Sequence, residues 1–260
     1  MAARFFALNL IDQSGTTFNI TTGTEDANFP LTNMKNPHST KVFRTTSGTS
    51  AVIEVDLQAV SSADYFLLRG HDINGLLISA VTIEANATNS WGSPAFSTTV
   101  TDFDTEENLA SVAFGSTQTY RYWRFTFTSS TAPVEVSNIF LGLKTELTNQ
   151  GIALGWKFTR IDNTEIVVNR YGQKFIDTST DIKKIEASMT VLNVTEMESM
   201  NDVFDYCGNS KPVWVIVDPS ETIVNNKDRF AGMYYFKERP GFVNDSYSIY
   251  SAEFELEEAK

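Results

Sequence analysis

The segment from Thr119 to Phe127 alternates between apolar and polar side chains, and this period constrains the fold more than any other feature of the chain. Trp123, Phe125 and Phe127 fall on one side of an extended backbone, and the residues between them fall on the other. A strand with one buried and one solvated face requires this period of two. The segment therefore predicts a sheet that buries one face, as in an all-β sandwich.

Similar patterns before and after this segment predict two domains. Ile53, Val55 and Leu57 alternate with acidic residues, and about eight strands can be placed before residue 145, the first of them over residues 5–11. The composition changes at residues 147–151. We expect a jelly-roll β-sandwich over residues 1–147 and a second, β-rich α+β domain over residues 148–260.

One amphipathic helix is expected in the second domain, at about residues 195–207. Thr195 is a suitable N-cap residue, and Glu198 three positions later would complete a capping box. The apolar residues that follow recur at spacings of three and four, which places them on one face of a helix. Gly208 is expected to end the helix.

The charge and cysteine content exclude several classes of function. The chain of 260 residues has a formal net charge of −12, which disfavours binding to nucleic-acid phosphates or to an anionic membrane. The acidity either keeps the protein soluble or suits the wall of a channel that conducts DNA without binding it. Cys207 is the only cysteine, so no disulfide can form within the chain. We find no signal peptide and no apolar run long enough to span a membrane.

No motif indicates catalysis, a metal or a cofactor, and we expect the protein not to be an enzyme. The two histidines, His38 and His71, lie far apart, and no nucleophile motif accompanies them. Asp102-x-Asp104-x-Glu106 begins like a calcium loop but lacks the glycine and the final glutamate that such a loop needs. We interpret it as a solvated acidic loop.

Aromatic residues offer candidate contacts for a carbohydrate. Trp91 lies in a polar segment and is the best candidate, and Tyr120 and Tyr122 are weaker ones. The alternative is that Trp91 closes one end of a sandwich. Trp156 and Trp214 fall on strand patterns and are expected in the core.

Several motifs, in order along the chain, resemble a galactose-binding-like (discoidin-type) jelly roll over residues 28–145. They are Asn28-Phe29-Pro30-Leu31-Thr32-Asn33-Met34, Ile53-Glu54-Val55-Asp56-Leu57, Leu68-Arg69-Gly70-His71-Asp72, Arg121-Tyr122-Trp123-Arg124 and Ile139-Phe140-Leu141-Gly142. The ordered set is similar to structural proteins of tailed-phage tails. Gly155-Trp156, Lys211-Pro212-Val213 and the helix extend this resemblance into the second part.

This resemblance implies a structural subunit of a phage tail tip or baseplate ring, assembled in the host cytoplasm and carried in the virion. Its partners would be copies of itself and other tail proteins, with DNA passing through a lumen and no membrane contact. The alternative function is a carbohydrate-binding module for attachment to the host surface. The cysteine pair that flanks secreted discoidin domains is absent, and no sugar-binding residue of the family can be matched in this chain.

Overall fold

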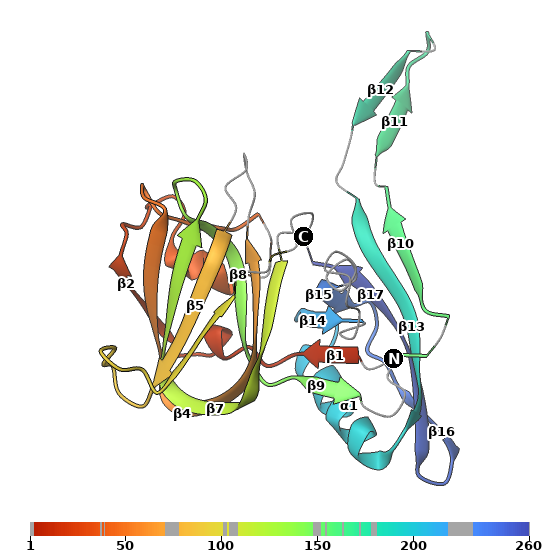
Figure 1. The fold of residues 1–260 in the computed structure, drawn as a ribbon. Helices are drawn as coiled ribbons and strands as arrows, with labels where there is room; N and C mark the ends of the chain where they lie inside the picture. Colours follow the sequence, from red (N-terminus) through yellow and green to blue (C-terminus); the bar gives the residue numbers. More distant parts are fainter. Residues whose placement is uncertain are drawn as a thin grey trace. The chain divides into compact units, whose positions relative to one another are not determined.

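The computed structural model describes residues 3–36, 38, 40–70, 78–100, 103, 109–147, 152–153, 155–162, 164–171, 173–177, 181–217 and 231–259. These residues are mostly in β-strands and form two compact units (Figure 1). Among the described residues, the N-terminal unit takes in residues 6–145, and the second unit joins residues 3–5 to residues 146–217 and 231–259.

The N-terminal unit is a β-sandwich built on two very long antiparallel strands. Its strands are β2 (Thr17–Thr22), β3 (Phe43–Arg44), β4 (Ser50–Gly70), β5 (Ile78–Asn86), β6 (Phe96–Val100), β7 (Leu109–Ser129) and β8 (Glu135–Gly142). The first half of β4 pairs with β2 and with the end of β7, and β5 and β6 continue that layer. The second half of β4 pairs with β8 and with the start of β7, and β3 continues that layer. Register shifts after Asp56 and Ala63 separate the two halves, so β4 and β7 contribute to both layers.

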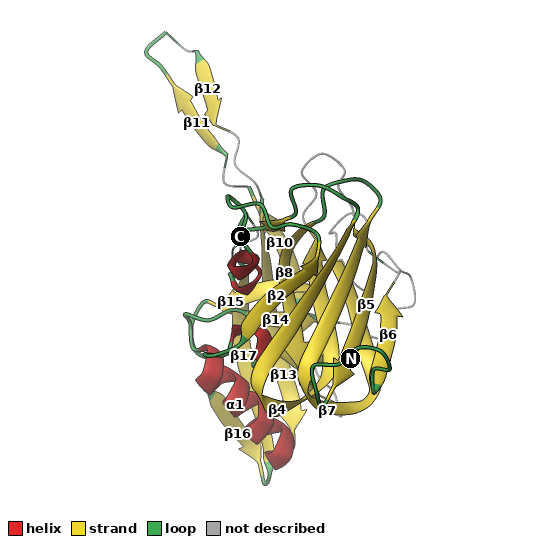
Figure 2. Cartoon of the chain, turned by 90° about the vertical axis from the view of Figure 1, so that its left-hand side faces the viewer, coloured by secondary structure: helices red, strands yellow, loops and turns green. Residues whose placement is uncertain are grey.

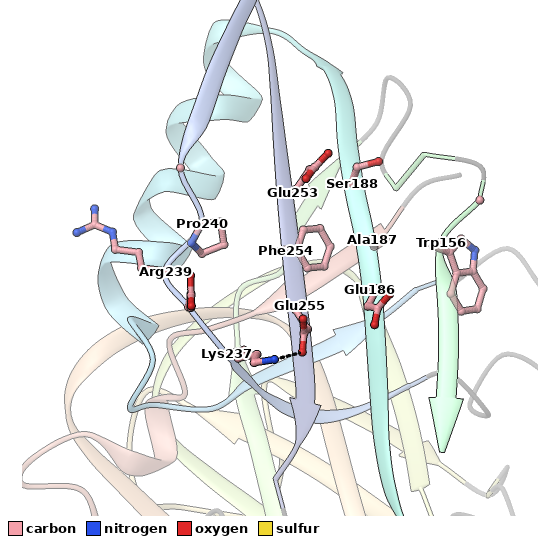
Figure 3. A pocket seen from close by; sticks show the side chains of 13 residues that line it. Trp156, Glu186, Ala187, Ser188, Lys237, Arg239, Pro240, Glu253, Phe254 and Glu255 are labelled. Atoms are coloured by element: carbon pink, nitrogen blue, oxygen red, sulfur yellow. Dashed lines mark hydrogen bonds and ion pairs between the residues drawn. The ribbon is translucent and has the colours of Figure 1, made fainter. Parts of the chain in front are cut away.

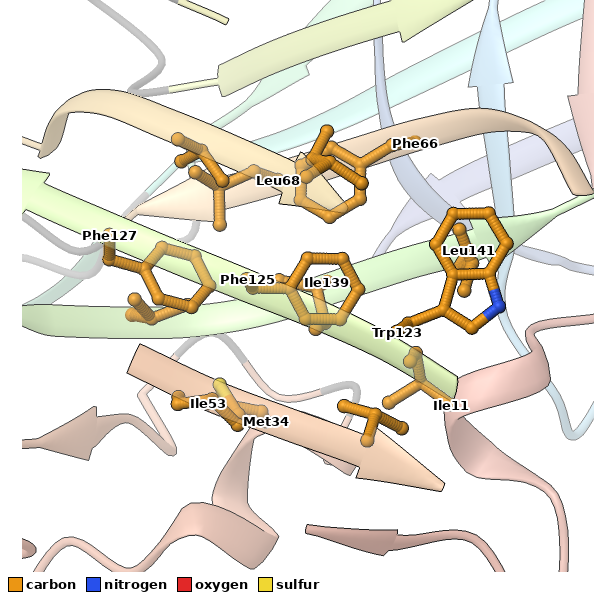
Figure 4. Packing of buried hydrophobic residues seen from close by; sticks show 14 of the residues in the cluster. Ile11, Met34, Ile53, Phe66, Leu68, Trp123, Phe125, Phe127, Ile139 and Leu141 are labelled. Atoms are coloured by element: carbon orange, nitrogen blue, oxygen red, sulfur yellow. The ribbon is translucent and has the colours of Figure 1, made fainter. Parts of the chain in front are cut away.

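The core of this unit lies between the two layers (Figure 4). Trp123, Phe125 and Phe127 are completely buried on one face of β7, as their alternation predicts. Phe125 stacks on Phe66 from β4, with 5.3 Å between the ring centroids. Trp123 stacks on Phe114 at 5.7 Å. Large aromatic rings therefore pack together with aliphatic side chains in the space between the sheets.

The second unit is an eight-stranded antiparallel sheet with one helix against it (Figure 2). Its strands are β1 (Ala3–Phe6), β9 (Thr145–Leu147), β10 (Lys157–Ile161), β13 (Ile182–Leu192), β14 (Val213–Ile216), β15 (Ala231–Phe236), β16 (Phe242–Ser246) and β17 (Ile249–Glu258). Helix α1 (Val194–Cys207) contacts β13 and β17 and buries Met200, Val203, Phe204 and Cys207. Phe204 meets the ring of Phe236 edge-on at 5.2 Å.

Two short strands of the same unit pair only with each other within the described residues. They are β11 (Glu165–Val168) and β12 (Lys174–Asp177), which lie between β10 and β13 in the chain. We call these two strands and the turn that connects them the arm. Within the described part of the chain, the helices outside the second unit are two 3-10 turns, η1 (Leu10–Asp12) and η2 (Leu31–Lys35).

The predicted fold class is confirmed: the chain is mostly β, with a β-sandwich in the N-terminal part followed by a β-rich part with one helix. Three local predictions were wrong. The first strand ends at Phe6, because Asn9 caps the 3-10 turn that follows. This strand also lies in the sheet of the second unit, between β14 and β9.

The third error concerns the capping box of the helix, whereas the helix itself, Val194–Cys207, lies where it was predicted, at about residues 195–207. Its capping box is Asn193 with Glu196, so the same four-residue pattern is used two positions upstream of Thr195 and Glu198. Asn193 Oδ1 accepts a hydrogen bond from the Glu196 N–H at 2.8 Å, and Glu196 Oε2 accepts one from the Asn193 N–H. Gly208 follows the helix with a positive φ of 53°, as expected for a residue that ends one.

Candidate functional site

The structure brings two of the three predicted carbohydrate contacts to one face of the sandwich. Tyr122 lies in β7 opposite Asp56 on one side and Asn86 on the other. Trp91 lies in the connection between β5 and β6, where its indole N–H donates to Asn89 Oδ1 at 2.8 Å. Tyr120 is partly buried against the sandwich core, so it is not part of an open aromatic surface with Trp91 and Tyr122.

An arginine guanidinium group lies against each of the two aromatic rings on this face. The Arg124 guanidinium lies 4.8 Å from the Trp91 ring centroid, and its Nε donates to Glu84 Oε2 at 2.6 Å. Arg121 donates two hydrogen bonds to the Asp56 carboxylate, which lower the pKa of Asp56, and its guanidinium lies 4.9 Å from the Tyr122 ring centroid. Each ring therefore already has a cation against it, and each cation already has a carboxylate.

The remaining predictions about chemistry concern metals, catalysis and membranes. His71 and the Asp102-to-Glu106 motif lie outside the described residues. Within the described ranges, no three His, Cys, Asp or Glu residues gather as a metal site would require. No helix among those ranges combines the length and apolar character needed to cross a membrane.

The second unit has an open pocket of about 670 Å³ on the polar face of β13 and β17 (Figure 3). Glu186 and Ser188 from β13 lie opposite Glu255 and Glu253 from β17. Trp156, just before β10, and the residues that follow β15, including Lys237 and Arg239, form its other walls. Trp156 is therefore half-buried at a pocket and not in the core, contrary to the prediction from its alternation with Phe158.

Most charges in this pocket are paired, but two carboxylates are not. Lys184 Nζ lies 2.8 Å from both Glu186 Oε1 and Glu255 Oε1, and its hydrogen bonds lower the pKa of each carboxyl group. Lys237 also pairs with Glu255, and Arg239 pairs with Asp205 of α1. Glu238 and Glu253 are exposed and have no ion-pair partner within the described residues. The pocket therefore offers two negative charges that no cation among the described residues pairs.

The arm carries the largest set of exposed apolar side chains in the described residues. Those with more than half of their surface exposed are Ile166 (56%), Val167 (52%), Val168 (56%), Tyr171 (74%), Phe175 (59%) and Ile176 (59%). The register places Ile166 opposite Ile176 and Val167 opposite Phe175. Because neighbouring residues of a strand point to opposite faces, both faces of the arm are apolar.

The side chain of Asn169 makes three hydrogen bonds to the described residues of the turn of the arm. Its Oδ1 accepts hydrogen bonds from the Tyr171 and Gln173 N–H groups at 2.9 and 3.0 Å, and its Nδ2 donates to Gln173 Oε1 at 2.8 Å. The Arg170 guanidinium lies 4.7 Å from the Tyr171 ring centroid. The turn thus presents an arginine and a tyrosine together, two residue types that are enriched among the strongest contacts of protein interfaces.

No family model and no curated protein matches this chain. Solved structures that are similar include a Streptococcus pneumoniae fucose binding module, with 13% identity, a TM-score of 0.42, and coverage of 52% of this chain and 96% of that chain. A chitosan-binding module from a Paenibacillus chitosanase/glucanase has 20% identity, a TM-score of 0.40, and coverage of 52% and 98%. With identities and TM-scores this low, these likenesses decide nothing about what the chain binds, and the sandwich assignment rests on the strand pairing described above.

Neither the arm nor the pocket was predicted from the sequence. A signal for the arm is present, because Ile166-Val167-Val168 and Phe175-Ile176 flank a turn-forming Asn169 segment. The pocket had no comparable signal. It gathers residues from β13, β17, the chain after β15 and the chain before β10, whose proximity follows only from the order of strands in the sheet.

Proposed function

We propose that the chain is a structural subunit of a tailed-phage tail, located at the tail tip or in a baseplate ring, and that it acts by protein–protein assembly. The arm is the observation that carries the proposal. Six large apolar side chains, each more than half exposed, lie on a single hairpin. Exposed apolar residues that are scattered singly need no explanation, but a contiguous group marks a surface that a partner covers.

The architecture of the arm supports the same proposal. A hairpin of two strands is marginally stable in water without a third strand or a packed face, and these strands pair only with each other among the described elements. Covering both faces in an assembly would supply the packing that the arm lacks. The resemblance noted in the sequence is the reason for proposing a phage tail as the assembly, and the net charge of −12 suits a lumen through which DNA passes.

The experiment that tests this proposal is quantitative mass spectrometry of purified tailed particles from the virus that encodes the chain. We expect the chain in every particle, at a copy number that matches the symmetry of a tail ring. Particles that lack the chain, with normal amounts of the other tail proteins as the internal control, would refute the proposed role.

A second candidate is carbohydrate binding at the face that carries Trp91 and Tyr122. The specific observation is that both rings lie on one face of the sandwich, each with an arginine guanidinium beside it, so a sugar would compete with the arginine for the ring. Titration calorimetry against fucose and chitosan oligosaccharides tests this candidate. Binding by the wild-type chain that is lost in Trp91→Ala would support it, whereas heat changes that are equal in the two proteins would count against it.

A further inference from the structure

We infer that the turn of the arm binds the Trp156 pocket of a second copy of this chain. This inference rests on the proposed function, because it names the partner of the same arm. The Trp156 pocket is the pocket described above, and the residues that matter here are Trp156, Glu238 and Glu253. The contact is head-to-tail: each copy uses its arm on one neighbour and its pocket on another.

Charge complementarity is the first reason to choose a second copy as the partner. Between Glu165 and Asp177 the chain holds two basic residues, Arg170 and Lys174, and no acidic one. Arg170 in the turn and Lys174 at the start of β12 therefore make this end of the arm cationic, whereas Glu165 and Asp177 lie at the other end, on a chain whose net charge is −12. Complementary potentials of this kind favour the correct partner and suppress others.

The pocket supplies the matching groups. Glu238 and Glu253 are exposed and unpaired within the described part of the chain, whereas the neighbouring Glu186 and Glu255 are already held by Lys184. The Arg170 guanidinium and the Lys174 ammonium group of a neighbouring copy would pair there with these two carboxylates. Trp156 lines the same pocket.

The conformation of the arm also favours docking of the turn. Asn169 already accepts hydrogen bonds from the Tyr171 and Gln173 N–H groups, and Arg170 already lies against Tyr171, so these residues need little further ordering on binding. A contact between two different patches leaves one patch unused on each of two bound copies, unlike the contact in a two-fold dimer. Such contacts continue from copy to copy and form a ring when the rotation between copies closes.

Exchange of charges between the two patches tests this inference on the full-length chain. The arm variant is Arg170→Glu with Lys174→Glu, and the pocket variant is Glu238→Lys with Glu253→Lys. Sedimentation velocity and mass photometry measure self-association of each variant alone and of an equal mixture of the two. The side chains at all four positions are exposed. The circular dichroism spectrum and the melting temperature of each variant should therefore match those of the wild type.

We expect concentration-dependent oligomers of the wild type, and at least about 10-fold weaker self-association of each variant alone, because like charges then meet in every contact. In the mixture every arm again meets a pocket of opposite charge, so association should recover to within about 3-fold of wild type. Lys41→Glu with Asp202→Lys, which changes exposed charges elsewhere, is the matched control and should associate as the wild type does.

Three results would overturn the inference. The first is a wild-type chain that stays monomeric at about 100 µM, a high concentration for a specific interface of standard strength. The second is a pocket variant that associates like the wild type while the arm variant does not, which places the arm on another surface. The third is a mixture that fails to recover. In each case, detection of the chain in tail particles would still support the proposed function. Failure of the contact between arm and pocket can therefore be distinguished from failure of the proposed tail role.

Discussion

Replacing the apolar side chains of the arm should abolish assembly without weakening the fold. The variant carries serine at Ile166, Val167, Phe175 and Ile176, which are 52–59% exposed. Full burial of such a side chain contributes about 1.5–3 kcal/mol, and roughly half of each surface remains to be buried, so each residue can contribute about 1 kcal/mol to association. Four residues give about 4 kcal/mol, which corresponds to an approximately 1,000-fold weaker dissociation constant.

The stability of the two units should hardly change, because substitutions of exposed residues usually alter the free energy of unfolding by about 0.5 kcal/mol or less. Sedimentation equilibrium measures the dissociation constant, and denaturant unfolding measures the stability. Ile166→Val with Ile176→Val, which keeps the arm apolar and β-branched, is the control and should retain association. The reasoning is refuted if the serine variant associates like the wild type, or if it loses several kcal/mol of folding stability.

Three further predictions concern the fold itself. Phe66→Ala removes a completely buried ring that stacks on Phe125, and should lower the free energy of unfolding by about 3–5 kcal/mol; a loss under about 1 kcal/mol in denaturant unfolding would contradict the packing described. Asn193→Ala removes the N-cap of α1 and should cost about 1 kcal/mol in the same assay, with Asn193→Asp as a control that keeps the cap. Burial raises the pKa of the Cys207 thiol to about 12, so it should not react with a disulfide reagent at about pH 8 until the chain is unfolded; rapid labelling of the native protein would show that the thiol is accessible.

The sequence could predict elements whose pattern depends on local burial alone. Alternation identifies the end of β7, because Trp123, Phe125 and Phe127 all point into a core that covers only one face of that layer. The helix was found for the same reason, since its apolar stripe has the helical period. Its exact start was not predictable, because two overlapping four-residue patterns could each form the capping box and the one that includes Asn193 does.

Features that depend on long-range pairing could not be predicted. β1 belongs to the sheet of the second unit because of strand partners more than a hundred residues away. Trp156 has the alternation of a core strand, but it lies just before an edge strand and lines an open pocket. The arm is apolar on both faces, a pattern that normally signals a buried strand, and only the pairing of β11 with β12 alone shows that it is exposed.

The division of the chain at residues 147 and 148 stays a prediction, as do the phage-tail role and the candidate carbohydrate contacts at Trp91, Tyr120 and Tyr122. The structure adds the arm and the Trp156 pocket, an exposed apolar hairpin with a basic turn end and a pocket lined by carboxylates, within one unit. A chain that carries both an exposed apolar hairpin and a receptive acidic pocket can join identical copies through a single kind of contact.

Cryo-electron microscopy of the native assembly that contains this chain is the most direct measurement. Head-to-tail assembly through the arm predicts density for Arg170 and Tyr171 of each copy beside Trp156 and Glu253 of the next, repeated around a closed ring. An assembled particle in which the hairpin of every copy remains surrounded by solvent would contradict it.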